Sequence, residues 1–199
     1  MLLCAITDRN RTNQPLLSLV ESWSRGGVNF IQLREKDLDA TELQSLAREV
    51  MAKIDHSRTR LLVNISTPEA TALALAAGAD GVHLAGKPTR GAASRVRQIF
   101  GRGVPVISVP CHSLQDVDVA HAEEVDLMLF SPVFEKVSGD EISVPQGLEG
   151  LRLVCARAGG IPVLALGGVT AGNASDCVAA GAAGIAAIRL FAGDDWRRL

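Results

Sequence analysis

Three polar side chains alternate along one short segment of the chain, Gln32, Arg34 and Lys36. In an extended strand, alternate side chains point to the same side, while Leu33 and Glu35 point to the other. A guanidinium offers a planar fork to a phosphate group, and an ammonium adds a point charge. The spacing therefore predicts an anion receptor. The alternative is an exposed strand end whose cations form surface salt bridges.

A pair of glycines, Gly167 and Gly168, follows an apolar run at residues 162–166. Glycine lets backbone N–H groups come close to the oxygen atoms of an anion. The pair therefore predicts a second phosphate site. The alternative is a plain turn between a strand and a helix.

Two of the four histidines, His83 and His112, stand where apolar runs end. Either imidazole could act as an acid or a base, and His83 could equally be a hydrogen-bonded core residue. No pair of histidines has a spacing typical of a metal site, such as HExxH. Cys111 precedes His112, but neighbours in an extended segment face opposite sides, which disfavours a cysteine–histidine nucleophile.

These side chains must be positioned by a repeat of short aliphatic runs and helical segments. Between the runs, apolar residues recur every three to four positions, as they do in 43–54. Strands that alternate with helices form right-handed crossovers and a parallel sheet. The runs that we interpret as strands are 2–6, 28–33, 60–64, 81–84, 104–109, 126–130, 162–166 and 184–188.

Eight such units predict one α/β domain over residues 1–199, a (β/α)8 TIM barrel of eight parallel strands. An open doubly wound sheet has the same local pattern, but the sequence lacks its GxGxxG turn after the first strand. The segments AAGADG at 76–81 and AAGAAG at 179–184 each end a helix and begin a strand. Their recurrence indicates equivalent units rather than two different domains.

Polar residues interrupt the aliphatic pattern at one end of nearly every predicted strand. In a TIM barrel these carboxyl ends form the active-site mouth, and the loops after the last two strands commonly hold phosphate. Beside the groups named above, the predicted mouth contains Thr7, Asp8, Arg9, Asn64, Ser131 and Arg189.

The composition excludes several classes of protein. A net charge of −2 argues against a nucleic-acid-binding protein, and the apolar runs are too short to span a membrane. The four cysteines include no CxxC pair and fit buried free thiols, and the short apolar start has no basic leader. We therefore expect a cytoplasmic protein. Association into homo-oligomers is an expectation by analogy with other barrels.

The residues assembled so far resemble the superfamily of thiamin-phosphate synthase and its TenI-like thiazole tautomerase relatives. The matching segments occur in the family's order over nearly the whole chain. They are 6–9 (ITDR), 31–36 (IQLREK), 62–64 (LVN), 78–84 (GADGVHL), 112–114 (HSL), 130–134 (FSPVF), 147–151 (GLEGL) and 166–169 (LGGV).

The resemblance implies an enzyme that joins hydroxymethylpyrimidine diphosphate to thiazole phosphate and releases pyrophosphate. It places the diphosphate contacts on Gln32, Arg34, Lys36 and Asn64, and the thiazole-phosphate contacts near Gly168 and the eighth strand. Charge stabilisation would carry the rate as pyrophosphate leaves. We therefore assign catalytic roles to Arg34, Lys36 and His83.

The sequence departs from the family pattern at the site itself. Ile65 and Pro88 stand where the family has magnesium-binding carboxylates, and neither side chain supplies an oxygen ligand. No metal site is therefore predicted, and Mg²⁺ could enter only with the diphosphate of the substrate. Three cations, Lys87, Lys136 and Arg189, occur near the same predicted mouth and could replace the charge of the metal.

Further departures leave the activity open. Pro110 and Arg189 replace family serines, 136–139 (KVSG) replaces a Thr-x-Thr-Lys segment, and Pro132 replaces the histidine of the tautomerases. Three functions remain: a synthase, a thiazole-phosphate tautomerase that uses His83 or His112 as its base, and a barrel that binds thiamin phosphate or a precursor without turnover.

Two segments carry further expectations. We expect residues 135–146 to form a mobile loop over the site, most flexible at 138–140, and Trp196 to cover the flank of the barrel where the tail is short for an eighth helix.

Overall fold

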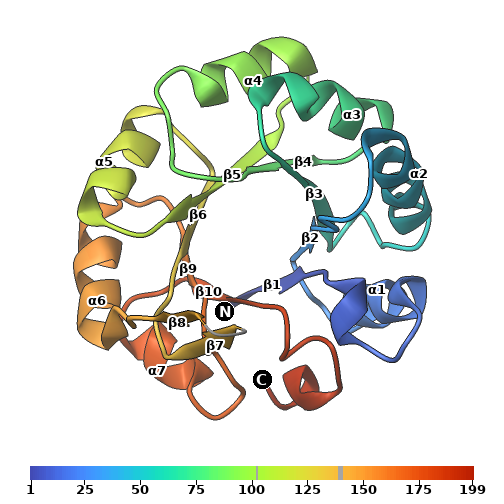
Figure 1. The fold of residues 1–199 in the computed structure, drawn as a ribbon. Coiled ribbons are helices and arrows are strands. Elements are labelled where there is room, and N and C mark those ends of the chain that lie inside the picture. The colour runs from blue at the N-terminus through green and yellow to red at the C-terminus, as the bar shows by residue number, and fades with distance from the viewer. Residues whose placement is uncertain (102, 139–140) are drawn as a thin grey trace.

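A computed structural model of the chain describes residues 1–101, 103–138 and 141–199, and for 136–138 and 141–143 it describes the backbone alone. Eight parallel strands close into a barrel in the order β1-β10-β9-β6-β5-β4-β3-β2. Because β1 pairs with both β2 and β10, the predicted TIM barrel is confirmed and the open sheet is wrong (Figure 1). The strands are β1 (Leu2–Ile6), β2 (Phe30–Leu33), β3 (Arg60–Ile65), β4 (Gly81–Leu84), β5 (Val106–Cys111), β6 (Leu127–Phe130), β9 (Val163–Ala165) and β10 (Gly184–Ala187).

Each predicted run overlaps a strand, but four strands begin later than predicted, β2 and β5 by two residues and β6 and β9 by one. Val28 precedes β2 because its N–H bonds the carbonyl of Trp23 at the end of a helix, at 3.0 Å. Val104 precedes β5 in a loop, where it is 93 % exposed. Apolar residue type alone did not separate these positions from the strands that follow them.

The helices form a ring around the barrel, so that each strand except β10 is followed by a return across its outer face (Figure 1). Some of these helices begin at a residue whose side chain caps the first turn. The Asp39 side chain accepts from the N–H groups of Thr41 and Glu42, and the Glu42 side chain accepts from the Asp39 N–H. The helices are α1 (Leu16–Arg25), α2 (Ala40–Met51), α3 (Thr71–Ala76), α4 (Ala92–Phe100), α5 (Leu114–Ala122), α6 (Gly147–Arg157) and α7 (Ala174–Ala179), with 3₁₀ turns η1 (Arg9–Arg11), η2 (Pro68–Ala70) and η3 (Asp195–Arg198).

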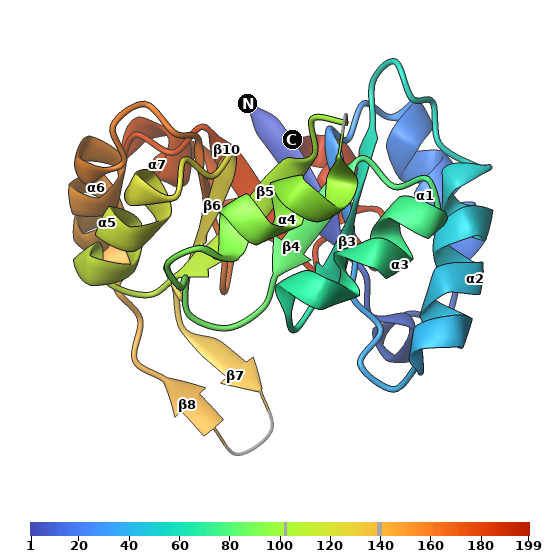
Figure 2. The same ribbon diagram turned by 90° about the horizontal axis from the view of Figure 1, so that it is seen from above.

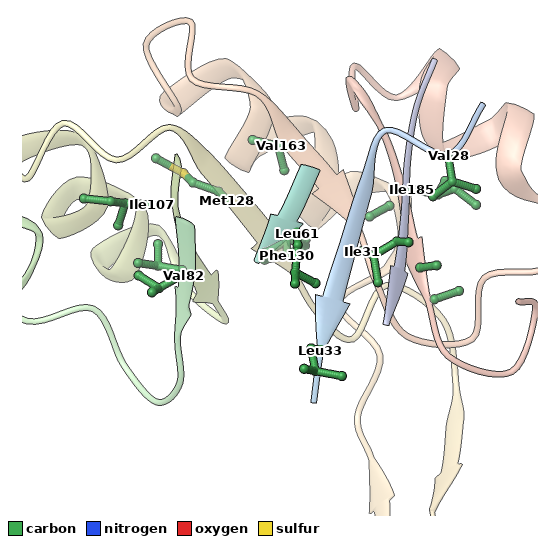
Figure 3. Close-up of a cluster of buried hydrophobic side chains, with 14 of the residues drawn as sticks. Val28, Ile31, Leu33, Leu61, Val82, Ile107, Met128, Phe130, Val163 and Ile185 are labelled. Carbon is green, nitrogen blue, oxygen red and sulfur yellow. The ribbon is translucent and has the colours of Figure 1, made fainter. Parts of the chain in front are cut away.

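Alternation along each strand divides the core into two layers. Outward side chains such as Ile31, Leu33 and Val82 pack against the helices in the larger apolar cluster (Figure 3). Inward side chains such as Cys4 and Leu62 fill the barrel itself as a second cluster. This division decides which residues can reach the mouth, because only inward positions face the barrel interior.

The repeated glycine motif has a steric basis. Gly78 and Gly181, at φ +79° and +102°, end their helices in the left-handed conformation. Gly81 and Gly184 begin the next strands, where a Cβ atom would lie 2.0 Å from the Val106 carbonyl oxygen and 1.9 Å from the Leu2 carbonyl oxygen. Both glycines of each motif are therefore required, for different reasons.

The expected flank cover is confirmed at the C-terminus. After β10 the chain makes a turn and η3 in place of an eighth helix. Trp196 is 4 % exposed and stacks on Phe191 at 6.0 Å between ring centroids. The Trp23 indole donates to the Phe191 carbonyl at 3.1 Å, which ties this cover to α1.

The segment expected to be a loop contains regular structure. Strands β7 (Lys136–Ser138) and β8 (Glu141–Ser143) pair antiparallel and project from the barrel as a hairpin (Figure 2). Val137 and Ile142 are paired in its register, and such β-branched residues favour an extended chain. Gly139 and Asp140 lie outside the described residues, and the mobility of the segment stays a prediction.

None of the helices among the described residues is long and apolar enough to cross a membrane.

Gly184→Ala tests the packing of β10 against β1. Because the new methyl group meets backbone that cannot yield, we expect the free energy of unfolding to fall by about 3 kcal/mol. Gly193→Ala is the control, since nothing lies within 4 Å of the Cβ position there. Urea denaturation measures both variants. Equal stability of the two would contradict the steric account.

Candidate functional site

Four neighbouring strands place polar side chains inside the barrel. Gln32 on β2, Asn64 on β3, His83 on β4 and Ser108 on β5 lie between outward-facing apolar residues, and so they face inward. The Gln32 amide Nε2 donates to Asn64 Oδ1 at 3.1 Å. His83 Nδ1 and Ser108 Oγ are 2.9 Å apart. Two hydrogen-bonded pairs therefore form a continuous polar arc over β2–β5.

His83 is an electrically neutral member of this arc. Burial, with a smaller contribution from the positive charge of Arg34, lowers the pKa of His83 to about 3. The sequence left open whether His83 is a hydrogen-bonded core residue or a site residue. In the structure it is hydrogen-bonded inside the barrel and also lies in the candidate site.

The other strands line the interior with hydrocarbon. Ile6 on β1, Leu129 on β6, Leu164 on β9 and Ala186 on β10 belong to the inward apolar cluster. The barrel interior is therefore two-sided, with a polar arc from β2 to β5 and an apolar arc from β6 through β9 and β10 to β1.

Arg34 and Lys36 lie beyond the end of β2, in the rim rather than in the strand. The Arg34 N–H donates to Thr7 Oγ1 at 2.9 Å, and its side chain is half-buried. Lys36 is exposed in a turn, where strand alternation no longer decides its direction. Glu35 between them is buried. Within the described ranges, neither cation forms an ion pair, so the surface salt-bridge alternative is not supported.

The glycine pair forms a close junction between two rim segments. Gly167 and Gly168 have φ of +94° and +66°, and a Cβ on Gly167 would lie 2.8 Å from Pro132 Cα. The Phe134 N–H donates to the Gly167 carbonyl at 3.0 Å. Asn173 Nδ2 donates to the Gly168 carbonyl at 3.1 Å. This junction is more constrained than a plain turn, and it leaves Gly168 exposed.

Three other cations, Lys87, Arg189 and Lys136, were also predicted at the mouth. Lys87 lines a separate hollow with Pro88 and Glu123, between the outer barrel wall and α4, where it is exposed. Arg189 lies on the exposed turn after β10. The backbone of Lys136 begins β7, and its side chain is outside what the structure describes. The structure therefore unites Gln32, Arg34, Asn64 and His83, but does not bring Lys87 to them.

Ser108 is a site residue that was not singled out from the sequence, and Thr7 was placed at the predicted mouth without a specific role. Ser108 orients His83, and Thr7 holds the backbone of Arg34. The available signal was a lone hydroxyl inside the aliphatic run of β5, at a position that alternates with its outward neighbours.

His112 stands at the end of β5 on the exposed side of the chain. Its Nδ1 lies 2.8 Å from the Ser131 carbonyl oxygen, which can only accept, so this contact selects the tautomer with the proton on Nδ1. Cys111 is buried on the other side, and burial raises the pKa of its thiol to about 12, with the Asp116 charge adding to the shift. A cysteine–histidine nucleophile is therefore excluded, as alternation predicted.

The residues present do not fit a resident metal ion. Ile65 is 3 % exposed and packs in the outer apolar layer, and Pro88 has no side-chain oxygen. In the part of the chain that the structure describes, no cluster of three or more His, Cys, Asp or Glu could hold a metal. Of the two positions at which the resemblance implies carboxylates, Ile65 contributes to packing and Pro88 lines the hollow beside α4.

A family model described as thiamine monophosphate synthase matches residues 3–191 of this chain. The chain is 40 % identical over 195 residues to a Geobacter sulfurreducens protein named "Putative thiamine-phosphate synthase", covering 96 % of this chain and 87 % of that one. It is 35 % identical over 187 residues to a Chlorobium luteolum protein named "Thiamine-phosphate synthase", covering 94 % and 83 %.

The fold is also similar to that of a solved structure described as thiamine phosphate pyrophosphorylase from Pyrococcus furiosus. The TM-score is 0.80 at 27 % sequence identity, and the match covers 99 % of this chain and 90 % of that one.

The buried neutral His83 makes stability depend on pH. In the unfolded chain, the His83 side chain binds a proton below its ordinary pKa of 6.5. In the folded chain it binds that proton only below about pH 3. The stability is therefore fully present above pH 6.5 and falls by about 1.4 kcal/mol per pH unit between these values. Urea denaturation from pH 7 to 4 should show this loss in the wild type and a smaller one in His83→Gln. His56→Gln, at an exposed histidine, is the control and should keep the wild-type slope. A wild-type slope in His83→Gln would contradict the assignment.

Proposed function

Because this chain belongs to the thiamine monophosphate synthase family, we propose that it joins hydroxymethylpyrimidine diphosphate to thiazole phosphate and releases pyrophosphate. The observation that carries the proposal is the two-sided barrel interior beneath a cationic rim. The polar arc suits the edge of one heterocycle, and the apolar arc suits a ring face. The rim above β2 suits the diphosphate.

Arg34 and Lys36 bind the diphosphate in this proposal. Arg34 has its backbone fixed by Thr7 and a guanidinium close enough to His83 to affect its titration. A guanidinium fork binds two phosphate oxygens at once, and Lys36 adds a mobile point charge. Asn64 completes the group from the neighbouring strand.

Gln32 has a more specific role than phosphate binding. Its amide nitrogen is engaged by Asn64, and within the described residues its buried Oε1 has no hydrogen-bond partner. A buried acceptor without a partner is unfavourable, and it suits a donor such as a ring amino group better than an anionic oxygen. We therefore assign Gln32 to the edge of the pyrimidine.

The thiazole phosphate is placed at the junction of Gly167 and Gly168. Gly168 is exposed, and its carbonyl is turned away to Asn173, which supports an orientation with N–H groups toward the mouth. Arg189 follows β10 on the same rim, and Lys136 begins the neighbouring hairpin. Lys87 contributes only if its loop moves from the hollow that it lines.

The reaction itself requires charge stabilisation more than proton transfer. The bond between the pyrimidine methylene carbon and the diphosphate oxygen breaks, and its electron pair leaves with pyrophosphate. The cationic carbon then forms its new bond to the thiazole. Arg34 and Lys36 stabilise the charge that develops on the leaving group, while the neutral His83 places no positive charge beside the carbon. Because no resident metal site fits, any Mg²⁺ would arrive on the diphosphate itself.

Arg34→Gln is the direct test of this proposal. An assay for thiamin phosphate from both precursors should detect product with the wild type, and the variant should lower kcat/KM by roughly 100-fold. Arg11→Gln makes the same charge change on the neighbouring rim, where Arg11 pairs with Asp8, and should stay near the wild type.

One outcome would contradict the synthase, and a second measurement would then identify the alternative. No thiamin phosphate from the wild type, with or without Mg²⁺, would reject the reaction. A rise in melting temperature with either precursor in that experiment would then identify a binding protein without turnover.

The fixed tautomer of His112 favours a second candidate, a tautomerase acting on a thiazole phosphate. Its Nε2 lone pair is set by the Ser131 carbonyl contact and belongs to an exposed side chain. In that case His112→Asn should lower isomerisation of a thiazole phosphate by at least about 100-fold, while synthase turnover stays unchanged. Isomerisation that survives in His112→Asn and in the double variant with His83→Asn would reject this candidate.

A further inference from the structure

We propose that Arg9 and Glu35 are positioning residues that hold the diphosphate-binding cations in place. Neither residue touches the substrate in this account. Their contact fixes the segment 34–37 against the segment 7–9, and Arg34 and Lys36 bind diphosphate tightly only while that contact is made. The inference rests on the proposed role of these two cations in the synthase reaction.

The contact joins two consecutive rim segments. Glu35 Oε2 accepts from the Arg9 backbone N–H at 3.1 Å and from Arg9 Nη1 at 3.3 Å. Arg9 Nη2 also donates to Asp37 Oδ2 at 2.7 Å. One guanidinium therefore connects two acidic residues on the segment after β2.

A separate pair of bonds anchors the start of the same segment. Thr7 donates its N–H to the Gln32 carbonyl at 3.0 Å, and its hydroxyl accepts from the Arg34 N–H at 2.9 Å. Arg34 and Lys36 flank Glu35 in the chain. The backbone that carries both cations has little freedom to move, because Thr7 holds it at Arg34 and Arg9 holds it at Glu35.

The burial of Glu35 argues that the contact serves position rather than stability. Its side chain is 1 % exposed, and its Oε1 has no hydrogen-bond partner in the described part of the chain. A half-satisfied buried carboxylate contributes little to folding, because its desolvation offsets its attraction to Arg9. The charge of Arg9 is meanwhile balanced by Glu35 and Asp37, so Arg9 is a poor competitor for the anion.

Positioning and simple electrostatics predict opposite effects of neutralising Glu35. Removing a negative charge from an anion-binding rim should strengthen anion binding if charge alone matters. Releasing segment 34–37 should weaken binding, because the anion must then order the two cations itself. The sign of the change in affinity therefore separates the two accounts.

The experiment measures the affinity for inorganic pyrophosphate by isothermal titration calorimetry. We expect Glu35→Gln to raise Kd by about tenfold, with a melting temperature close to that of the wild type. Asp8→Asn is the matched control, because it removes one carboxylate from the same rim and releases only Arg11. It should leave Kd unchanged or slightly lower.

Steady-state kinetics provide a second readout. Glu35→Gln should raise KM for the pyrimidine diphosphate and leave KM for the thiazole phosphate unchanged, whereas general unfolding would affect both. Arg9→Gln combined with Glu35→Gln should weaken binding no more than the stronger single variant, since both act through one contact.

Equal or tighter pyrophosphate binding by Glu35→Gln would overturn the inference and leave the proposed function standing. A wild type that binds no pyrophosphate would overturn the anion site, and the proposed function with it. Should Glu35→Gln not fold, the exposed Asp37→Asn tests the same contact. It should raise Kd by about threefold, against the direction that charge removal predicts.

Discussion

Closure of the barrel is the constraint on which the rest of this structure depends. The sheet has no free edge, because β1 pairs with β10 from Leu2↔Gly184 to Ala5↔Ala187. That pairing is close enough to require a glycine opposite the Leu2 carbonyl. Once the sheet is closed, every strand has one side chain series inside and one outside, and the carboxyl ends of all eight strands meet at one mouth.

The division of the interior into two arcs follows from closure and from a few residue choices. Gln32, Asn64, His83 and Ser108 are inward on adjacent strands, so each can bond across to a neighbour. Such pairing makes buried polar groups tolerable, and it leaves the Gln32 oxygen as the acceptor still to be satisfied. The opposite arc is apolar, so the two sides of the interior differ in polarity.

The rim is held by contacts between consecutive loops rather than by the strands. The segment after β2 bonds the segment after β1, and the segment after β6 packs on Gly167 and Gly168 after β9. This arrangement places the cations Arg34 and Lys36 above the barrel strands.

The sequence by itself determined the fold, placed Gln32, Asn64 and His83 at the ends of neighbouring strands, and disfavoured Cys111 as a nucleophile, because strand periodicity and alternation are local rules. It could not decide how far alternation continues, so it grouped Lys36 with Gln32 although β2 ends at Leu33. It placed Lys87 at the mouth, whereas the tertiary structure turns that loop toward α4. The sequence also could not identify the hydrogen-bond partners of Arg9, Glu35 and Ser108. Each of these depends on which loops lie side by side, and that is settled only when the barrel closes and its return segments pack.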